Sequence, residues 1–81
     1  MKIKILFFAT LRDYVDAKTI ELEVPAETTV AGLKELLVKR YPKMVPARDS
    51  IMTAINREYA ADEQAIPLGA EIALFPPVSG G

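Results

Sequence analysis

The C-terminal stretch is Glu71-Ile72-Ala73-Leu74-Phe75-Pro76-Pro77-Val78-Ser79-Gly80-Gly81, an apolar, strand-like run followed by two prolines and a pair of glycines. Neither proline can donate a hydrogen bond within a sheet, so the sheet is predicted to stop after Phe75. Consecutive prolines favour the stiff polyproline II conformation, which advances about 3.1 Å per residue. Residues 76–81 are therefore expected to form an extended tail that points away from a domain formed by residues 1–75.

The end of this tail suits insertion into another protein. Gly80 and Gly81 have no Cβ, so their backbone can approach another surface closely. Because Gly81 is the last residue, its carboxylate is expected to be free to react. We therefore predict a carrier protein that works through its own C-terminus, with Gly81 and Gly80 as the catalytic positions. The alternative is an ordinary frayed chain end, since termini are often disordered.

The composition excludes several classes of function. With 81 residues, of which 51% are hydrophobic and 26% charged, the chain is predicted to be one ordinary globular domain. A net charge of -1 argues against a nucleic-acid partner. The chain has no Cys and no His, and so lacks the commonest general base and the commonest metal ligands. We expect no self-contained active site, no cofactor bound by this chain and no metal site.

Hydropathy indicates the compartment. No segment approaches the roughly 20 apolar residues that cross a membrane. The lysines and short apolar run of residues 1–9 are a weak match to a signal peptide, because the apolar part is too short. A cytoplasmic protein without a membrane partner is therefore expected.

Alternating and helical patterns predict the elements of the N-terminal half. Residues 2–8 and 18–24 alternate as strands, and the short connection over residues 10–16 favours an antiparallel hairpin. A helix follows, with Thr28 or Thr29 as its N-cap and Pro42 as its end; Lys34 is expected off its apolar face. That apolar face consists of Val30, Leu33, Leu36 or Leu37, and Tyr41.

Short strands and turns are predicted for the C-terminal half. They are a loop over residues 43–50, a strand over 51–55, a turn at 56–57, an edge strand over 58–60, an irregular segment over 62–67 and the last strand over 71–75.

This element order predicts an α+β fold. One main helix must cover one face of a mixed sheet of four to five strands, with the first and last strands as neighbours. The arrangement is the β-grasp of ubiquitin, followed here by an extended C-terminal tail. The side chains expected to face the helix from the first and last strands are Ile3, Ile5, Phe7, Ile72 and Leu74.

The same pairing places Phe8 and Phe75 together on the face away from the helix, with Tyr59 within reach. An aromatic cluster near the start of the tail suits the centre of a protein interface. From the pattern alone, covering the back of the sheet is an equally good interpretation of these residues.

Several segments resemble MoaD, the family of small subunits of molybdopterin synthase. They are Lys4-Ile5-Leu6-Phe7-Phe8-Ala9 with Arg12, then Ile55-Asn56, then residues 71–81. The resemblance covers the whole chain, and the Phe-Pro-Pro-Val-Ser-Gly-Gly ending is its most specific part. ThiS, the thiamine-pathway sulfur carrier, is similar in fold and in Gly-Gly but typically lacks the Phe-Pro-Pro approach. One departure is Leu68-Gly69-Ala70 where the MoaD family often has Asp-Gly-Asp.

The resemblance implies a sulfur carrier in molybdenum cofactor biosynthesis. A MoeB-like E1 activating enzyme would use ATP and magnesium to adenylate the Gly81 carboxylate, and a persulfide-derived sulfur would displace AMP. The resulting thiocarboxylate would enter the MoaE-like large subunit within a heterotetramer. There it would donate sulfur to cyclic pyranopterin monophosphate to form the dithiolene of molybdopterin. Alone, the chain would be non-catalytic.

The resemblance also implies the site residues. Gly81 would carry the sulfur, and Gly80, which has no side chain, would keep the tail narrow just before it. For Arg12 a solvated loop charge is an equally good interpretation, because surface ion pairs are typically worth only about 0–1 kcal/mol. The implied partner interface consists of Phe8, Arg12, Tyr59, Phe75, Pro76, Pro77 and Val78.

Three other functions remain open. A sulfur carrier for thiamine or tungsten cofactor would use the same tail chemistry with a different acceptor protein. A ubiquitin-like protein modifier would pass the same adenylate to a lysine. A β-grasp binding module would need no covalent chemistry, and deletion of Gly80 and Gly81 would leave its function intact.

Overall fold

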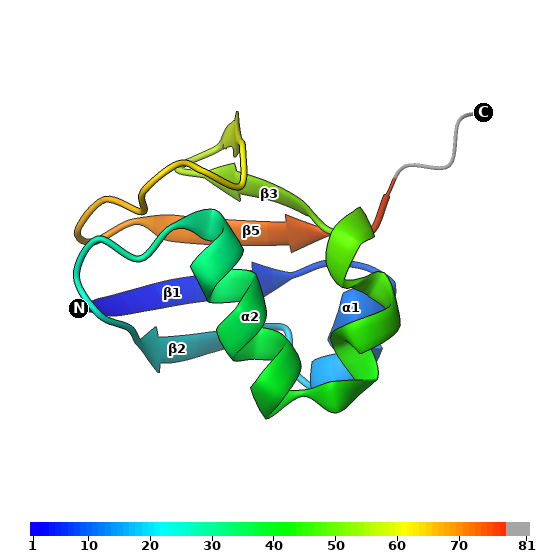
Figure 1. The fold of residues 1–81 in the computed structure, drawn as a ribbon. Helices are drawn as coiled ribbons and strands as arrows, with labels where there is room; N and C mark the ends of the chain where they lie inside the picture. The colour runs from blue at the N-terminus through cyan, green and yellow to red at the C-terminus, as the bar shows by residue number, and fades with distance from the viewer. Residues whose placement is uncertain (78–81) are drawn as a thin grey trace.

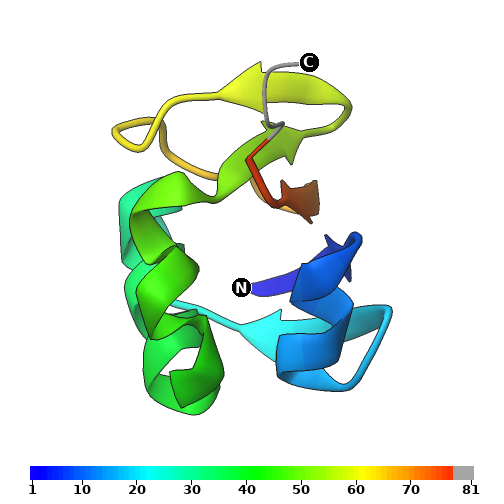
Figure 2. The ribbon, with the colours of Figure 1, turned by 90° about the vertical axis from the view of Figure 1, so that its right-hand side faces the viewer.

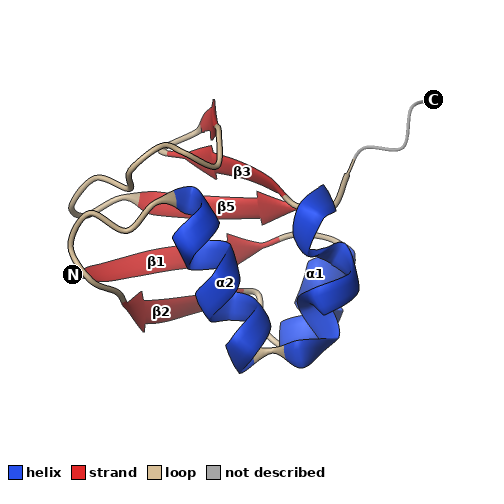
Figure 3. Ribbon diagram, viewed as in Figure 1, coloured by secondary structure: helices blue, strands red, loops and turns tan. Residues whose placement is uncertain are grey.

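The computed structural model describes residues 1–77 and contains a five-stranded mixed sheet with its main helix on one face (Figures 1 and 3). The strand order is β2-β1-β5-β3-β4, in which β1 and β5 are parallel and the other neighbours antiparallel. This arrangement confirms the predicted β-grasp. Along the chain the elements are β1 (Lys2–Phe7), α1 (Thr10–Val15), β2 (Thr19–Glu23), α2 (Val30–Arg40), the 3-10 helix η1 (Pro42–Ser50), β3 (Met52–Ile55), β4 (Glu58–Ala60) and β5 (Glu71–Phe75).

The first and last strands form the centre of the sheet, as predicted. Ile5 pairs with Ile72 and Phe7 pairs with Leu74 in the parallel register. All four side chains are at most 1% exposed and lie in the core. Each side chain of this kind contributes about 1.5–3 kcal/mol when it is buried. Viewed end-on, α2 and η1 lie to one side of the strands (Figure 2).

Residues 10–16 were expected to be a plain connection, and this prediction is wrong, because residues 10–15 form α1. Leu11 and Val15, four positions apart, lie on the same side of this helix and are buried. Only six residues long, the helix depends on this burial for its stability. The apolar spacing of Leu11, Tyr14 and Val15 was the signal in the sequence.

The turn into α1 contains an unusual backbone conformation. Ala9, at the N-cap, has φ 52° and ψ -131°, and no side chain caps the helix there. Glycine adopts this region readily, whereas a residue with a Cβ pays about 1–3 kcal/mol to be held there. The surrounding contacts therefore hold Ala9 in a strained conformation between β1 and α1.

The first turn of α2 is capped by two parts of the chain. The Thr29 hydroxyl accepts a hydrogen bond from the Gly32 N–H at 3.1 Å, which selects Thr29 from the two predicted caps. The Val30 and Ala31 N–H groups donate to the Gln64 and Asp62 carbonyls at 3.0 and 2.9 Å. The irregular segment after β4 thus satisfies helical N–H groups that would otherwise have no partner.

Lys34 was predicted off the apolar face of the helix, but it is only 5% exposed. Its ammonium group donates to the Ile51 carbonyl at 2.9 Å and to the Asp62 carboxylate at 2.8 Å. Helical periodicity cannot reveal these partners, which come from distant parts of the chain. Lys34 therefore joins α2 both to the start of β3 and to the segment that caps the helix.

The remaining connections contain one further correction. The predicted loop over residues 43–50 is the helix η1, whose Met44 is fully buried. The predicted turn at Asn56 and Arg57 is confirmed, with φ values of 48° and 73° that suit a tight hairpin between β3 and β4. Within residues 1–77, no helix has the length and apolar character needed to cross a membrane.

Removal of the Asp62 carboxylate should destabilise the fold. In Asp62→Ala the buried Lys34 ammonium keeps only its bond to the Ile51 carbonyl. We expect the free energy of unfolding, measured by urea denaturation, to fall by about 1–3 kcal/mol. Asp49→Ala is the control: its side chain is 90% exposed, so its loss should stay within about 0.5 kcal/mol. Equal small losses for both variants would contradict a structural role for the Lys34–Asp62 pair.

Replacement of Ala9 by glycine should stabilise the fold. Relief of about 1–3 kcal/mol of backbone strain outweighs the entropy that glycine adds to the unfolded chain, about 0.4–1 kcal/mol. We expect Ala9→Gly to raise the melting temperature in thermal denaturation. In the control Ala61→Gly, at an exposed residue without positive φ, the entropy effect alone should lower it. A lower melting temperature for both variants would refute strain at Ala9.

Candidate functional site

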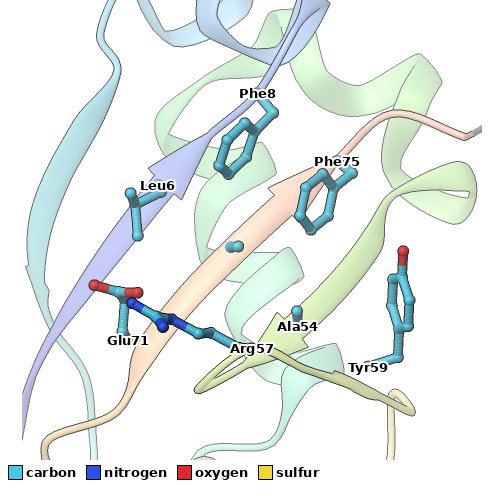
Figure 4. A pocket seen from close by; sticks show the side chains of 8 residues that line it. Leu6, Phe8, Ala54, Arg57, Tyr59, Glu71 and Phe75 are labelled. Carbon is cyan, nitrogen blue, oxygen red and sulfur yellow. The ribbon is translucent and has the colours of Figure 1, made fainter.

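Three aromatic side chains gather on the sheet face away from α2, at the end where Pro76 begins (Figure 4). The rings of Phe8 and Phe75 are stacked, with centroids 4.7 Å apart and planes inclined by 13°. Tyr59 lies on the other side of Phe75, with its ring centroid 6.5 Å away and tilted by 56°. The predicted placement of these three residues is confirmed; their role in binding a partner stays a prediction.

Strand pairing accounts for this gathering. The Phe8 N–H donates to the Leu74 carbonyl at 3.1 Å, so the pairing of β1 with β5 continues one residue beyond β1. Successive residues of a strand point to opposite faces. Phe7 and Leu74 therefore enter the core, whereas Phe8 and Phe75 meet on the open face.

Arg12 extends this group from α1. Its Nε donates to the Phe7 carbonyl at 2.9 Å, and its guanidinium carbon lies 5.6 Å from the centre of the Phe8 ring. This is a cation–π geometry. Arg12 is exposed, but it is held by two contacts and is not a free loop charge. We call the three aromatic residues Phe8, Phe75 and Tyr59, together with Arg12, the aromatic row.

The aromatic row separates two shallow hollows in the open face. One, of about 350 Å³, is lined beside the row by Leu6, Ala54 and Ala73, with Arg57 and Glu71 at its far end (Figure 4). The small side chains of Ala54 and Ala73 leave room for this hollow between the larger side chains that line it. An apolar surface with charged groups at its margin resembles the centre and rim of a protein interface.

The second hollow, of about 340 Å³, adjoins Pro76 and Pro77, the first two residues of the predicted tail. Pro76 and Pro77 line it together with Ala9 and Met52 and with members of the aromatic row. Tyr59 is 71% exposed and Met52 is 38% exposed, so large apolar groups face solvent beside the prolines. A partner that covered this hollow would contact both the row and these two prolines.

Three predicted site residues, Val78, Gly80 and Gly81, lie outside the described residues. Their roles stay predictions. Seven lining residues of the hollows had not been predicted as site residues: Leu6, Ala9, Met52, Ala54, Arg57, Glu71 and Ala73. Arg57 was predicted to be in a turn, and its place beside the open face follows from the register of β3 with β4. The register of β3 with β4 cannot be predicted from the sequence pattern alone.

Comparisons with known proteins identify the family and the fold. The model of the ThiS family matches residues 5–81. The molybdopterin synthase sulfur carrier subunit of Arabidopsis thaliana is 31% identical over 100% of this chain and 84% of its own. The crystal structure of small archaeal modifier protein 1 of Haloferax volcanii is 30% identical, covers 95% of this chain and 98% of its own, and has a TM-score of 0.83.

A more distant neighbour shows the same fold in an assembly. It belongs to the protein–protein complex of subunits 1 and 2 of molybdopterin-converting factor from Helicobacter pylori. The similarity covers 100% of both chains, with a TM-score of 0.68 and 17% identity. The family match and the curated relative both extend over nearly the whole sequence. The chain belongs to the ThiS family.

Proposed function

We propose that this chain is a sulfur carrier in molybdenum cofactor biosynthesis, the sulfur-donating small subunit of a molybdopterin synthase. The observation that carries the proposal is the aromatic row at the root of a tail that ends in Gly80 and Gly81. Full-length similarity to a curated sulfur carrier subunit supports it. The row would bind the partner, and the tail would bring the reacting carbon to the partner's active site.

The chemistry would take place at the Gly81 carboxylate. This group is a poor acyl donor, so an activating enzyme would first use ATP to form the acyl-adenylate and release pyrophosphate. A persulfide of a donor protein would then attack the carbonyl carbon and expel AMP, which leaves an acyl disulfide. A second thiol of the partner proteins would reduce its S–S bond and release the thiocarboxylate on Gly81. ATP and magnesium belong to the E1-like partner, in keeping with a chain that has no His and no Cys.

The acceptor partner would be a MoaE-like large subunit. The Helicobacter pylori neighbour, described as a complex of two subunits, supports a partner of this kind. Residues 76–81, if fully extended, would reach at most about 20 Å beyond the sheet. A surface that docks at the row would therefore admit the thiocarboxylate to a buried site, where sulfur would pass to cyclic pyranopterin monophosphate.

A second candidate function is protein modification. The likeness to small archaeal modifier protein 1, at 30% identity and nearly full coverage, favours it. The same acyl-adenylate serves both reactions, because an amine of a lysine can take the place of sulfur as the nucleophile. Covalent adducts of this chain in cell extracts would reveal that use.

Extension of the chain by one residue after Gly81 should abolish sulfur loading. The new carboxylate would be displaced from the position where it must attack the α-phosphate of ATP, and residues 1–77 would be unaffected. We expect intact mass spectrometry, after incubation with ATP, an E1-like enzyme and a sulfur donor, to show an oxygen-for-sulfur exchange only in the unextended chain. The thermal melting curve is the control for folding. Normal loading of the extended chain would refute the proposed role of Gly81.

Truncation of Phe75 should weaken partner binding more than it destabilises the fold. Phe75 lies in the middle of the aromatic row, and loss of such an anchor typically costs about 2 kcal/mol or more of binding free energy. We expect Phe75→Ala to raise the Kd for a MoaE-like large subunit, measured by calorimetry, by about 30-fold.

The neighbouring residue provides the matched control. Leu74 is fully buried on the opposite face, so Leu74→Ala should cost about 2–5 kcal/mol of stability. The affinity of the Leu74→Ala variant for the large subunit should stay unchanged at temperatures where the variant remains folded. A large loss of stability in Phe75→Ala with an unchanged Kd would show that Phe75 serves the fold instead.

A further inference from the structure

The aromatic row is connected from α1 to the residue that precedes the tail. Arg12 contacts Phe8 through its guanidinium group, and Phe8 stacks on Phe75. Phe75 is the last residue of β5 and is bonded to Pro76, the first residue of the predicted tail. Any change in the position of Phe8 would therefore act on the point from which the tail leaves the sheet.

Two different contacts hold the Arg12 side chain. The Nε–H bond to the Phe7 carbonyl, at 2.9 Å, ties it to the end of β1, and its guanidinium carbon lies over the Phe8 ring, 5.6 Å from the ring centre. A planar guanidinium with several fixed N–H groups can make both contacts at once. A lysine ammonium has the same charge but is neither planar nor able to hold that fork geometry.

The backbone between these residues also constrains Phe8. Ala9 is held at φ 52° and ψ -131°, and the Leu11 and Arg12 N–H groups donate to the Phe8 and Ala9 carbonyls at 3.2 and 3.1 Å. The strained turn thus brings α1 back beside Phe8. Strained backbone persists where surrounding contacts determine it, and it concentrates at functional sites.

We propose that Arg12 is a positioning residue, which fixes Phe8 against Phe75 and so sets the direction in which the tail leaves the sheet. This inference rests on the proposed sulfur-carrier function. It differs from a simple charge contact with a partner, because Arg12 acts within the free chain before any partner binds. Its effect passes through Phe8 and depends on the shape of the guanidinium more than on its charge.

The first test uses the free chain and needs no partner. Stacked rings shift each other's proton resonances, so the ring protons of Phe8 and Phe75 report directly on the stack. In Arg12→Lys we expect these resonances to move toward those of unstacked phenylalanine. Arg40→Lys is the matched control, because Arg40 lies 5.6 Å from the Tyr41 ring, at the end of α2, and should leave the Phe8 and Phe75 resonances unchanged.

The second test separates positioning from binding. We measure sulfur loading of the full chain by an E1-like enzyme with ATP and a sulfur donor. A misdirected tail lowers the rate of the reaction after the chain has bound to the E1-like enzyme. The kcat of that enzyme with the Arg12→Lys chain as substrate should therefore fall by about tenfold or more. A lost charge contact would instead raise KM at constant kcat, and Arg12→Lys would avoid even that because it keeps the charge.

Phe8→Ala supplies the internal check. Since Arg12 acts through Phe8, Arg12→Lys should lower kcat no further in the Phe8→Ala background. If Arg12→Lys lowered kcat by the same factor in the wild-type and Phe8→Ala backgrounds, the two residues would act independently. That result would overturn the proposal.

The outcomes distinguish this inference from the function on which it rests. Unchanged ring resonances or an unchanged kcat in Arg12→Lys, with normal loading of the wild-type chain, would refute positioning and leave the carrier function standing. Failure of the wild-type chain to accept sulfur from a competent enzyme would refute the carrier function, and the kinetic role of Arg12 with it. Altered resonances together with a reduced kcat would support both.

Discussion

The parallel pairing of β1 with β5 is the constraint on which the rest of this molecule depends. It joins the two ends of the described chain at the centre of the sheet. Alternation along these two strands sends Phe7 and Leu74 into the core and leaves Phe8 and Phe75 on the open face. The same backbone hydrogen bonds thus support the hydrophobic core and hold the proposed partner surface next to Pro76, where the predicted tail begins.

The two faces of the sheet have different tasks as a result. One face is covered by α2 and η1, and Lys34 ties α2 to Ile51, the residue before β3, and to Asp62 in the segment that caps the helix. Within the described residues, the other face carries shallow hollows and exposed apolar groups. A rigid body with one uncovered face suits a carrier whose chemistry takes place in other proteins, because the body only has to dock and present its tail.

Much of this architecture was predictable from the sequence, because strand alternation and proline positions are local signals. The five strands, the main helix and the contact between Phe8 and Phe75 were predicted from these signals. Helix α1 was missed because it is short, and its stability comes from buried Leu11 and Val15. The burial of Lys34 and the contacts of Arg12 depend on acceptors supplied by other segments. No periodicity in the sequence encodes those partners.

The most direct test of the proposed carrier role follows the fate of its sulfur. The chain carrying a Gly81 thiocarboxylate would be mixed with a MoaE-like large subunit and cyclic pyranopterin monophosphate, and its intact mass followed over a single turnover. We predict that sulfur is exchanged back for oxygen on the chain as the dithiolene forms, and only when the large subunit is present. A thiocarboxylate that survives this mixture, yet is discharged by a different acceptor protein, would contradict it.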